Sequence, residues 1–165
     1  AKKNPFALIK NMLPAYTTAI GTQSSAATIP VTTQCTKNNG VSDGMAEFVC
    51  PLCATIHLSG STITLTSCAM AVMVMTNQSI GFGKMFPFIL MLGVTMVAAP
   101  GVPGGAVMAL GILQSMLGFD ETMCGLMIAL YIAQDSFGTA CNVTGDGAIA
   151  VFMDAITGKK KAAAK

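Results

Sequence analysis

Charged side chains are scarce in this sequence. Only 10% of its 165 residues are Asp, Glu, Lys or Arg, and none of these lies between Glu47 and Lys84 or between Lys84 and Asp120. Hydrophobic residues make up 53% of the chain and the mean hydropathy is +0.66, far above that of an ordinary soluble domain. Each uncharged stretch is longer than the roughly 20 residues that cross the hydrocarbon core of a bilayer. The composition therefore predicts a membrane protein that contacts a lipid bilayer.

The few charges are unevenly placed. A net charge of +2, without a basic face that carries interleaved aromatic residues, argues against nucleic acid as a partner. Eight of the nine basic residues lie near the chain ends or in one polar loop: Lys2, Lys3, Lys10, Lys37, Lys159, Lys160, Lys161 and Lys165. Because positive loops tend to stay on the inside, both termini and the loop at 36–47 are expected to be cytoplasmic, opposite Asp120 and Glu121. We expect a multi-pass protein of the bacterial inner (cell) membrane.

The apolar stretches are interrupted by Gly, Pro, Ser and Thr at residues 57–62 and 98–105. Interrupted helices at membrane depth are tolerated only where they are buried in protein or line a watery cavity. Residues 21–30 are also too polar, and too rich in small side chains, for a membrane helix. The sequence therefore predicts that a short second helix begins after them, at 31–38.

These segments predict an all-α membrane protein built from two related halves. The predicted units are a first re-entrant hairpin at 5–38, a broken transmembrane helix at 42–77, a second re-entrant hairpin at 84–118, and a polar-striped transmembrane helix at 121–157. The first hairpin opens to the inside and the second to the outside, so the halves form an inverted repeat. Discontinuous helices in such repeats meet near the bilayer midplane and bind substrate and ions. We expect the whole of residues 1–165 to form one substrate-binding transport domain.

The last predicted helix carries nearly all its polar chemistry on one stripe. Asp135, Gly138, Thr139, Asn142 and Asp146 stand at i, i+3, i+4, i+7 and i+11, so they share one helix face. An ionised Asp in such apolar surroundings is costly unless it is paired, hydrogen-bonded or metal-bound. The stripe is therefore a candidate functional site. From this helix alone, the alternative that the stripe faces solvent or satisfies polar groups elsewhere in a bundle stays open.

Three other motifs favour less specific interpretations. Cys50 and Cys53 have the spacing of a thiol redox pair, and His57 extends them to a partial zinc set, but the βαβ context and a fourth ligand are missing. Asn142 begins a formal glycosylation sequon inside a predicted buried helix. The glycines at 101–105 imitate a phosphate loop without its Lys-Ser/Thr. We interpret the cysteines as small apolar side chains packed between helices.

Four motifs together resemble the dicarboxylate/amino acid:cation symporter family, also called the glutamate-transporter family. They are Gln-Ser-Ser-Ala-Ala-Thr-Ile-Pro at 23–30, Pro-Leu-Cys-Ala-Thr-Ile-His-Leu-Ser-Gly-Ser at 51–61, Pro-Gly-Val-Pro-Gly at 100–104, and the stripe from Asp135 to Asp146. The motifs follow the family's order over almost the entire chain. The resemblance implies six further helices, including the scaffold through which family members trimerise. We therefore expect a homo-oligomer or a missing scaffold domain as a partner.

The resemblance also implies a substrate site and no catalytic residues, so no enzyme activity is expected. The implied substrate-binding residues are Ser24, Ser25, Val102, Asp135, Gly138, Thr139 and Asn142. Asp135 would hold the substrate's ammonium group and Asn142, with backbone amides near the two serines, its carboxylate; Thr139 would contact the side chain.

The expected substrate is a small neutral amino acid such as Ser, Thr or Ala. Family members with acidic substrates place Arg where this chain has Gly138, and usually another Arg where it has Gln23. Without a guanidinium group, a side-chain carboxylate would lack its bidentate partner. The pattern is similar to the serine/threonine branch of the family.

Two sodium sites follow from the same resemblance. One would use the Asp146 carboxylate with the backbone carbonyls of Cys53, His57 and Asn142, and the other the backbone carbonyls of Thr55, Met96, Val97 and Ala99. A third family site is weakened because His57 and Ser59 replace Asn and Asp. The coupling could include a proton through His57.

The sequence thus predicts sodium-coupled symport of a small neutral amino acid, with this chain as the substrate- and ion-binding half. Two alternatives remain. In the first, the chain is a transport-incompetent membrane fragment or partner subunit that needs a separate scaffold. In the second, it belongs to a symporter of dicarboxylates or acidic amino acids.

Overall fold

The computed structural model describes residues 1, 3–98, 101, 104 and 106–163. This part of the chain contains helices and short connections, and no strand. The helices are α1 (Pro5–Thr22), α2 (Ser25–Asn38), α3 (Asp43–Ile56), α4 (Ser59–Met75), α5 (Phe82–Ala98), α6 (Ala106–Leu117) and α7 (Glu121–Ala163).

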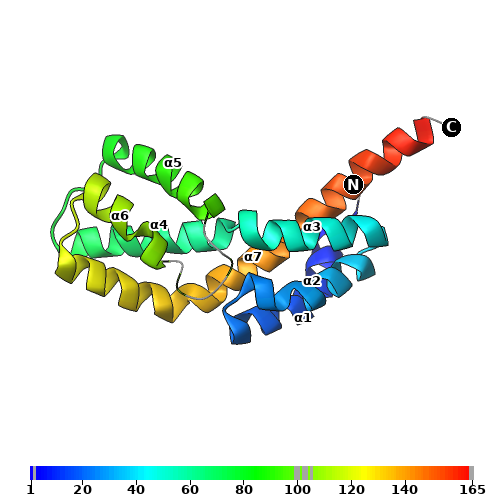
Figure 1. The fold of residues 1–165 in the computed structure, drawn as a ribbon, viewed down its shortest axis with the longest axis horizontal. Helices are drawn as coiled ribbons and strands as arrows, with labels where there is room; N and C mark the ends of the chain where they lie inside the picture. The colour runs from blue at the N-terminus through cyan, green and yellow to red at the C-terminus, as the bar shows by residue number, and fades with distance from the viewer. Residues whose placement is uncertain (2, 99–100, 102–103, 105, 164–165) are drawn as a thin grey trace.

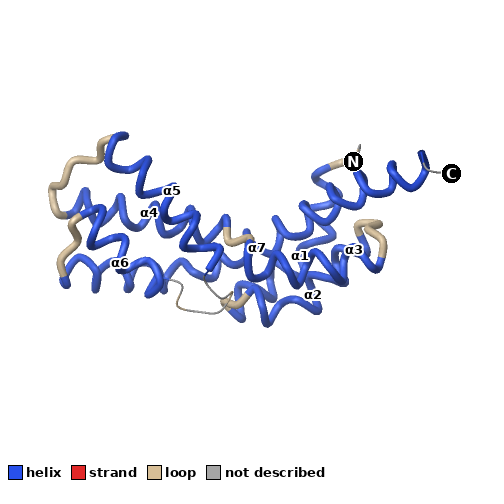
Figure 2. Tube along the Cα trace, turned by 45° about the horizontal axis from the view of Figure 1, so that its top comes forward, coloured by secondary structure: helices blue, strands red, loops and turns tan. Residues whose placement is uncertain are grey.

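Helix α7 runs the length of the elongated molecule and organises the other helices (Figure 1). Helices α1, α2 and α3 pack against one half of α7, whereas α4 and α6 pack against the other half and α5 packs on α4 and α6. The α1–α2 pair and the α5–α6 pair each fold back on themselves and approach the middle from opposite ends (Figures 1 and 2). The connections at the middle therefore bring four helix ends to one region.

Two predicted interruptions are shorter than the sequence suggested. Helix α2 begins at Ser25 rather than at residue 31, because the Ser24 side chain caps it by accepting a hydrogen bond from the Ala27 amide (3.2 Å). The break between α3 and α4 is limited to His57 and Leu58 instead of extending to residue 62. The Ser24 cap thus places polar sequence, which is unfavourable inside a membrane helix, in the first turn of α2.

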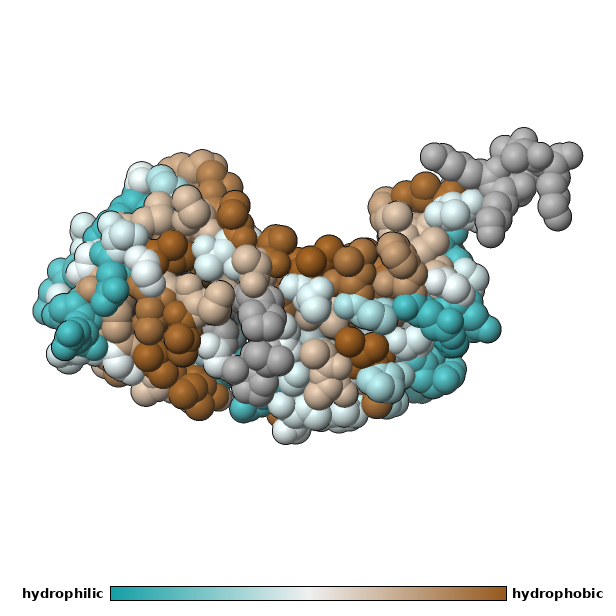
Figure 3. All heavy atoms as spheres, in the orientation of Figure 1, coloured by the Kyte–Doolittle hydropathy of each residue, from teal (hydrophilic) through white to brown (hydrophobic). Residues whose placement is uncertain are grey.

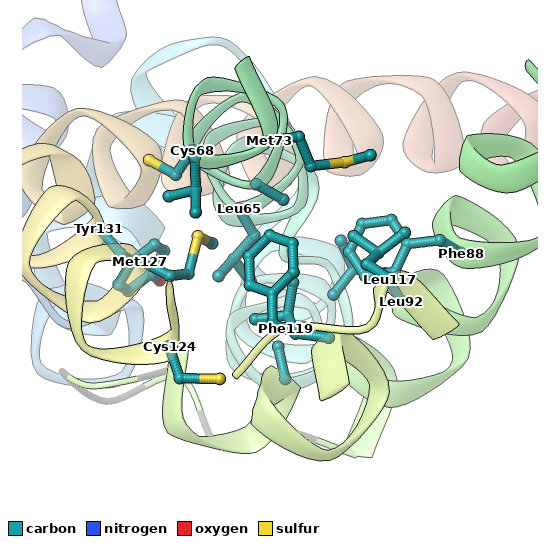
Figure 4. Packing of buried hydrophobic residues seen from close by; sticks show 14 of the residues in the cluster. Leu65, Cys68, Met73, Phe88, Leu92, Leu117, Phe119, Cys124, Met127 and Tyr131 are labelled. Atoms are coloured by element: carbon teal, nitrogen blue, oxygen red, sulfur yellow. The ribbon is translucent and has the colours of Figure 1, made fainter. Parts of the chain in front are cut away.

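A polar region in the middle of the molecule divides the hydrophobic core into separate clusters. One cluster fills the space between α4, α5, α6 and the first half of α7, and its largest members include Leu65, Phe88 and Tyr131 (Figure 4). Two smaller clusters lie on the other half, one around Met12 between α1, α2 and α7, and one around Val49 between α3 and α7. Between them lie buried polar side chains, including Ser24, Ser25, Ser61, Asp135, Thr139, Asn142 and Asp146.

On the face shown in Figure 3, much of the surface between the two ends of the molecule is apolar, above a paler and more polar lower edge. Hydrophilic residues gather at both ends of the long axis, and brown hydrophobic surface lies between them (Figure 3). Phe82, Val94 and Ile63 are among the large apolar side chains that are more than 60% exposed. Within the described residues, one stretch, Asp43–Met75, is long and apolar enough to cross a membrane, and it consists of α3, the two-residue break and α4.

Candidate functional site

The two helix pairs meet at the middle of the molecule. The Ser24 hydroxyl donates a hydrogen bond to the carbonyl of Gly101 (2.9 Å), and the Ala26 amide donates to the same oxygen (3.1 Å). Gly101 also lies against the Ala54 carbonyl, where a Cβ atom at position 101 would come within 2.1 Å of that oxygen. Segments separated by 77 residues are therefore in direct contact at the polar centre.

Asn142 on α7 joins this centre to the start of α4. Its side-chain oxygen accepts hydrogen bonds from the amides of Gly60 (2.8 Å) and Ser61 (3.3 Å), and its amide group donates to the Ser61 hydroxyl (2.9 Å). A side chain from a distant helix thus satisfies the first free amides of α4. One of the two Nδ2 hydrogens is used in this way, so the other is available to a ligand.

Helix α4 can approach α7 this closely because both helices carry glycine at the crossing. A Cβ atom on Gly60 would lie 2.2 Å from the Gly138 carbonyl, and one on Gly138 would lie 3.0 Å from the Thr64 hydroxyl. Gly138 therefore faces α4 and is not among the cavity-lining residues. The expectation that Gly138 contacts the substrate stays a prediction.

A small cavity lies beside Asp135 at the centre. Its volume is about 10 Å³, room for about one water molecule. The lining residues are Gln23, Ser25, Leu58, Ser61, Met96, Gly101, Tyr131, Asp135, Thr139 and Asn142. Four predicted substrate residues line it, and Ser24 is hydrogen-bonded at its edge; Val102 lies outside the described residues.

Sequence reasoning did not identify Ser61, Gly101 and Tyr131 as lining residues. Tyr131 had a usable signal, since it stands four residues before Asp135 and extends the same helix stripe by one turn. The tertiary fold brings Ser61 and Gly101 to the site from other helices.

Amino-terminal and carboxyl-terminal helix ends both lie near the cavity. The amino-terminal ends of α2 and α4 contribute the amides of Ala26, Gly60 and Ser61 to it. Helices α3 and α5 pack on each other, and their carboxyl-terminal ends lie at the same region (Figure 1). Because helix dipoles are positive at the first kind of end and negative at the second, the centre suits an anion and a cation side by side.

The predicted ligands of the first sodium ion lie around Asp146, which is completely buried. Its Oδ1 lies 2.8 Å from the Nδ1 atom of His57, while its Oδ2 has no hydrogen-bond partner among the described residues. The carbonyl of Cys53 accepts the His57 amide (2.8 Å) at the end of α3. A buried carboxylate oxygen without a partner, beside the carbonyl end of a helix, fits a hard cation such as sodium.

The predicted ligands of the second sodium ion that the structure describes lie at the carboxyl-terminal ends of α3 and α5. Thr55 lies in the last turn of α3, and Met96 and Val97 lie in the last turns of α5. Carbonyls of a last helical turn lack intrahelical partners and can bind a cation. Ala99 lies outside the described residues.

The alternative motifs have simpler structural roles. Cys50 and Cys53 are buried, and the Cys50 thiol lies 3.4 Å from the Thr36 hydroxyl. Within the described part of the chain, no three His, Cys, Asp or Glu side chains come together as a metal site. Asn142 is 1% exposed and engaged by α4, so its sequon is inaccessible in this fold.

An apolar helical chain whose interrupted helices meet at a buried polar centre is typical of membrane transport proteins. Residues 1–156 match the model of the sodium:dicarboxylate symporter family. The chain therefore belongs to this family, whose members are transporters rather than enzymes.

Relatives named as excitatory and as neutral amino acid transporters are similar to this chain to nearly the same degree. Excitatory amino acid transporter 5 of Mus musculus is 31% identical over 153 residues, which cover 92% of this chain and 27% of that protein. Neutral amino acid transporter A of Bos taurus is 31% identical over 146 residues, covering 88% and 28%. Excitatory amino acid transporter 1 of Homo sapiens is 32% identical over 146 residues, covering 88% and 27%. The chain thus spans about a quarter of the length of these relatives.

Proposed function

We propose that this chain is the substrate- and ion-binding part of a sodium-coupled symporter for a small neutral amino acid. The observation that carries the proposal is the placement of Asp135 and Asn142 on one face of α7, beside the amino-terminal ends of α2 and α4. A zwitterion needs an anion for its ammonium group and hydrogen-bond donors for its carboxylate. Both are present around one buried cavity.

In this proposal Asp135 binds the ammonium group, and the free Nδ2 hydrogen of Asn142 binds the carboxylate. The Ser25 hydroxyl is buried without a hydrogen-bond partner among the described residues, so it is available as a further donor. A cavity of about 10 Å³ is too small for any amino acid. Binding therefore requires the contacts of Ser24 and Ala26 with Gly101 to separate, which opens the centre.

The neutral substrate is supported by the absence of guanidinium groups. The 165-residue sequence contains no arginine, so no side chain can form a bidentate pair with a substrate's second carboxylate. Gly138 packs against α4, which leaves little space there for a longer side chain. The relatives named above include transporters called excitatory and neutral, so the choice between substrate classes rests on these residues.

Sodium coupling is proposed at Asp146 and at the carbonyl ends of α3 and α5, where the last-turn carbonyls of Thr55, Met96 and Val97 lie. Sodium bound at these places would neutralise a buried carboxylate and draw together two helix ends of like polarity. Its binding would therefore stabilise the centre in the arrangement that closes over the substrate.

We further propose that the α1–α2 and α5–α6 pairs are re-entrant hairpins of an inverted repeat. They approach the polar centre from opposite ends, and the hydrophilic surface lies at those ends (Figure 3). With the basic termini on the cytoplasmic side, the α5–α6 hairpin would open outward. The matched region covers 27% and 28% of two of the relatives named above, and we propose that it acts together with a scaffold or with further copies of itself.

The test is calorimetric binding of L-serine, L-alanine, L-glutamate and L-aspartate to the detergent-purified chain, in sodium and in choline chloride. We expect sodium-dependent binding of the neutral amino acids and its loss in Asp135→Asn. The matched control is Asp154→Asn, because Asp154 lies on the same helix near the chain end and bonds to Ser42. Preferential binding of L-glutamate would favour an acidic amino acid symporter instead.

Absence of binding under every condition would favour the second candidate function, a membrane fragment or partner subunit that binds substrate only with a separate scaffold. The observation that favours this candidate is the coverage, since the relatives contain much sequence beyond the matched part.

A further inference from the structure

The cavity beside Asp135 has two unlike walls. One wall is formed by polar side chains and by Gly101. The other consists of Leu58, Met96 and Tyr131, all of which belong to the large hydrophobic cluster between α4, α5, α6 and α7. A molecule in an enlarged cavity would therefore meet hydrogen-bonding groups on one side and the end of a hydrophobic core on the other.

Tyr131 dominates the apolar wall. It has the largest side chain of the ten lining residues and is only 1% exposed. Figure 4 shows it beside Met127 on α7, in the group that includes Leu65 and Cys68 of α4. Its ring is therefore held by packing on the side away from the cavity, and it cannot easily swing aside for a ligand.

The phenol group of Tyr131 reaches the polar wall. Its hydroxyl lies beside the Asp135 carboxylate, one turn further along α7, and near the Ser61 hydroxyl. A buried tyrosine hydroxyl normally has a polar partner, and the neighbouring candidate is the Asp135 carboxylate, the group proposed to bind the substrate's ammonium. One side chain thus contributes a rigid ring to the apolar wall and a hydroxyl to the ammonium site.

We propose that Tyr131 determines substrate specificity by limiting the length of the amino acid side chain. This inference rests on the proposed function. When the ammonium and carboxylate groups occupy the polar wall, the third substituent of the α-carbon points toward the apolar wall. There it meets the Tyr131 ring, which leaves space for a short side chain and excludes a long one. The hydroxyl has a separate effect, since it orients Asp135 for every substrate.

The two effects separate in a set of variants. The measured quantity is the ratio of the dissociation constants of L-methionine and L-alanine, which does not depend on the active fraction of a preparation. Wild type is expected to bind L-alanine more tightly. Tyr131→Val and Tyr131→Leu should lower the ratio by about tenfold, because a few methylene groups in an apolar pocket discriminate by 10-fold or more. Tyr131→Phe should weaken both ligands and leave their ratio within about twofold, because it removes only the hydroxyl.

Tyr16 supplies the matched control, because it is the other tyrosine in the sequence and lies in an outer groove between α1 and α7. Tyr16→Val should leave the ratio unchanged. Tyr131→Leu is included because a smaller loss of volume costs less stability than Tyr131→Val. An unchanged ratio in whichever of these two variants binds L-alanine overturns the inference.

Wild type that binds L-methionine as tightly as L-alanine also overturns it, whatever the variants do. That result would leave the proposed function standing, since a neutral amino acid would still bind. Wild type that binds no amino acid would overturn the proposed function and this inference with it.

Discussion

The imidazole of His57 packs against α7. His57 stands in the break between α3 and α4, and its side chain contacts a buried carboxylate of α7. Its Nδ1 atom is 2.8 Å from Oδ1 of Asp146, and its ring lies so close to the helix that a Cβ atom at Gly145 would be 2.5 Å from Cε1. The His57 side chain is 26% exposed, whereas that of Asp146 is fully buried. The histidine therefore connects the buried acid with the surface of the protein.

Replacement of Gly145 by alanine tests this contact. The methyl group would collide with a rigid ring, so we expect His57 to leave Asp146 and the protein to lose about 1–3 kcal/mol of stability, as in other overpacked sites. The matched control is Gly147→Ala, whose methyl group would meet the flexible end of Met12 at 2.7 Å. Thermal unfolding should show a clear loss for the first variant and a change within about 1 kcal/mol for the second, because alanine also favours the helix. Equal effects would contradict the proposed packing of the ring.

Sodium should stabilise the wild-type chain through Asp146. At a sodium concentration one hundred times the dissociation constant, a single site adds about 2.7 kcal/mol to the free energy of unfolding. We expect the melting temperature in sodium chloride to exceed that in choline chloride, and the difference to become clearly smaller in Asp146→Asn, which keeps only the site proposed at the ends of α3 and α5. Asp154→Asn should keep the full difference, because Asp154 bonds to Ser42 near the end of the molecule. An undiminished sodium effect in Asp146→Asn would contradict sodium binding at this carboxylate.

The contact between the two helix pairs depends on glycine at position 101. A methyl group there would lie 2.1 Å from the Ala54 carbonyl, which belongs to α3 and cannot yield without moving the helix. Gly101→Ala should therefore separate the pairs, and hydrogen exchange at the Ala26 amide should become faster. Gly111→Ala is the control, since no atom lies within 4 Å of its added carbon. Unchanged protection of Ala26 in Gly101→Ala would show that this contact is absent in solution.

Asn142 has two separable roles, as the cap of α4 and as a donor to the substrate. Asn142→Asp keeps the oxygen that accepts from Gly60 and Ser61 but loses the donor hydrogens and adds negative charge. We expect α4 to remain folded, because a carboxylate is favourable at a helix amino terminus. Affinity for a neutral amino acid should fall at least tenfold, as calorimetry would show.

Asn142→Ala is the informative companion, because it should lose the cap as well, at a cost of about 1 kcal/mol in thermal unfolding. Normal amino acid binding by Asn142→Asp would mean that the substrate carboxylate lies elsewhere.

Much of the helical order was predictable from the sequence. Hydrophobic runs separated by Gly, Pro and polar residues located the helices, and all the interruptions between them fall where small or polar residues cluster. The errors concern caps. The starts of α2 and α4 were placed too late because Ser24 caps one locally and Asn142 caps the other from 82 residues away. A pattern of residue types cannot reveal a cap that comes from another helix.

By itself the sequence determined that the chain is helical and apolar, and that α7 carries Asp135, Asn142 and Asp146 on one face, since the helical period places them there. Only the tertiary structure decided what surrounds that face. It placed His57 on Asp146, turned Gly138 toward α4, and brought Tyr131 to the cavity wall. These relationships depend on how closely helices pack and at which level they cross, and such distances are set by contacts between residues far apart in the chain.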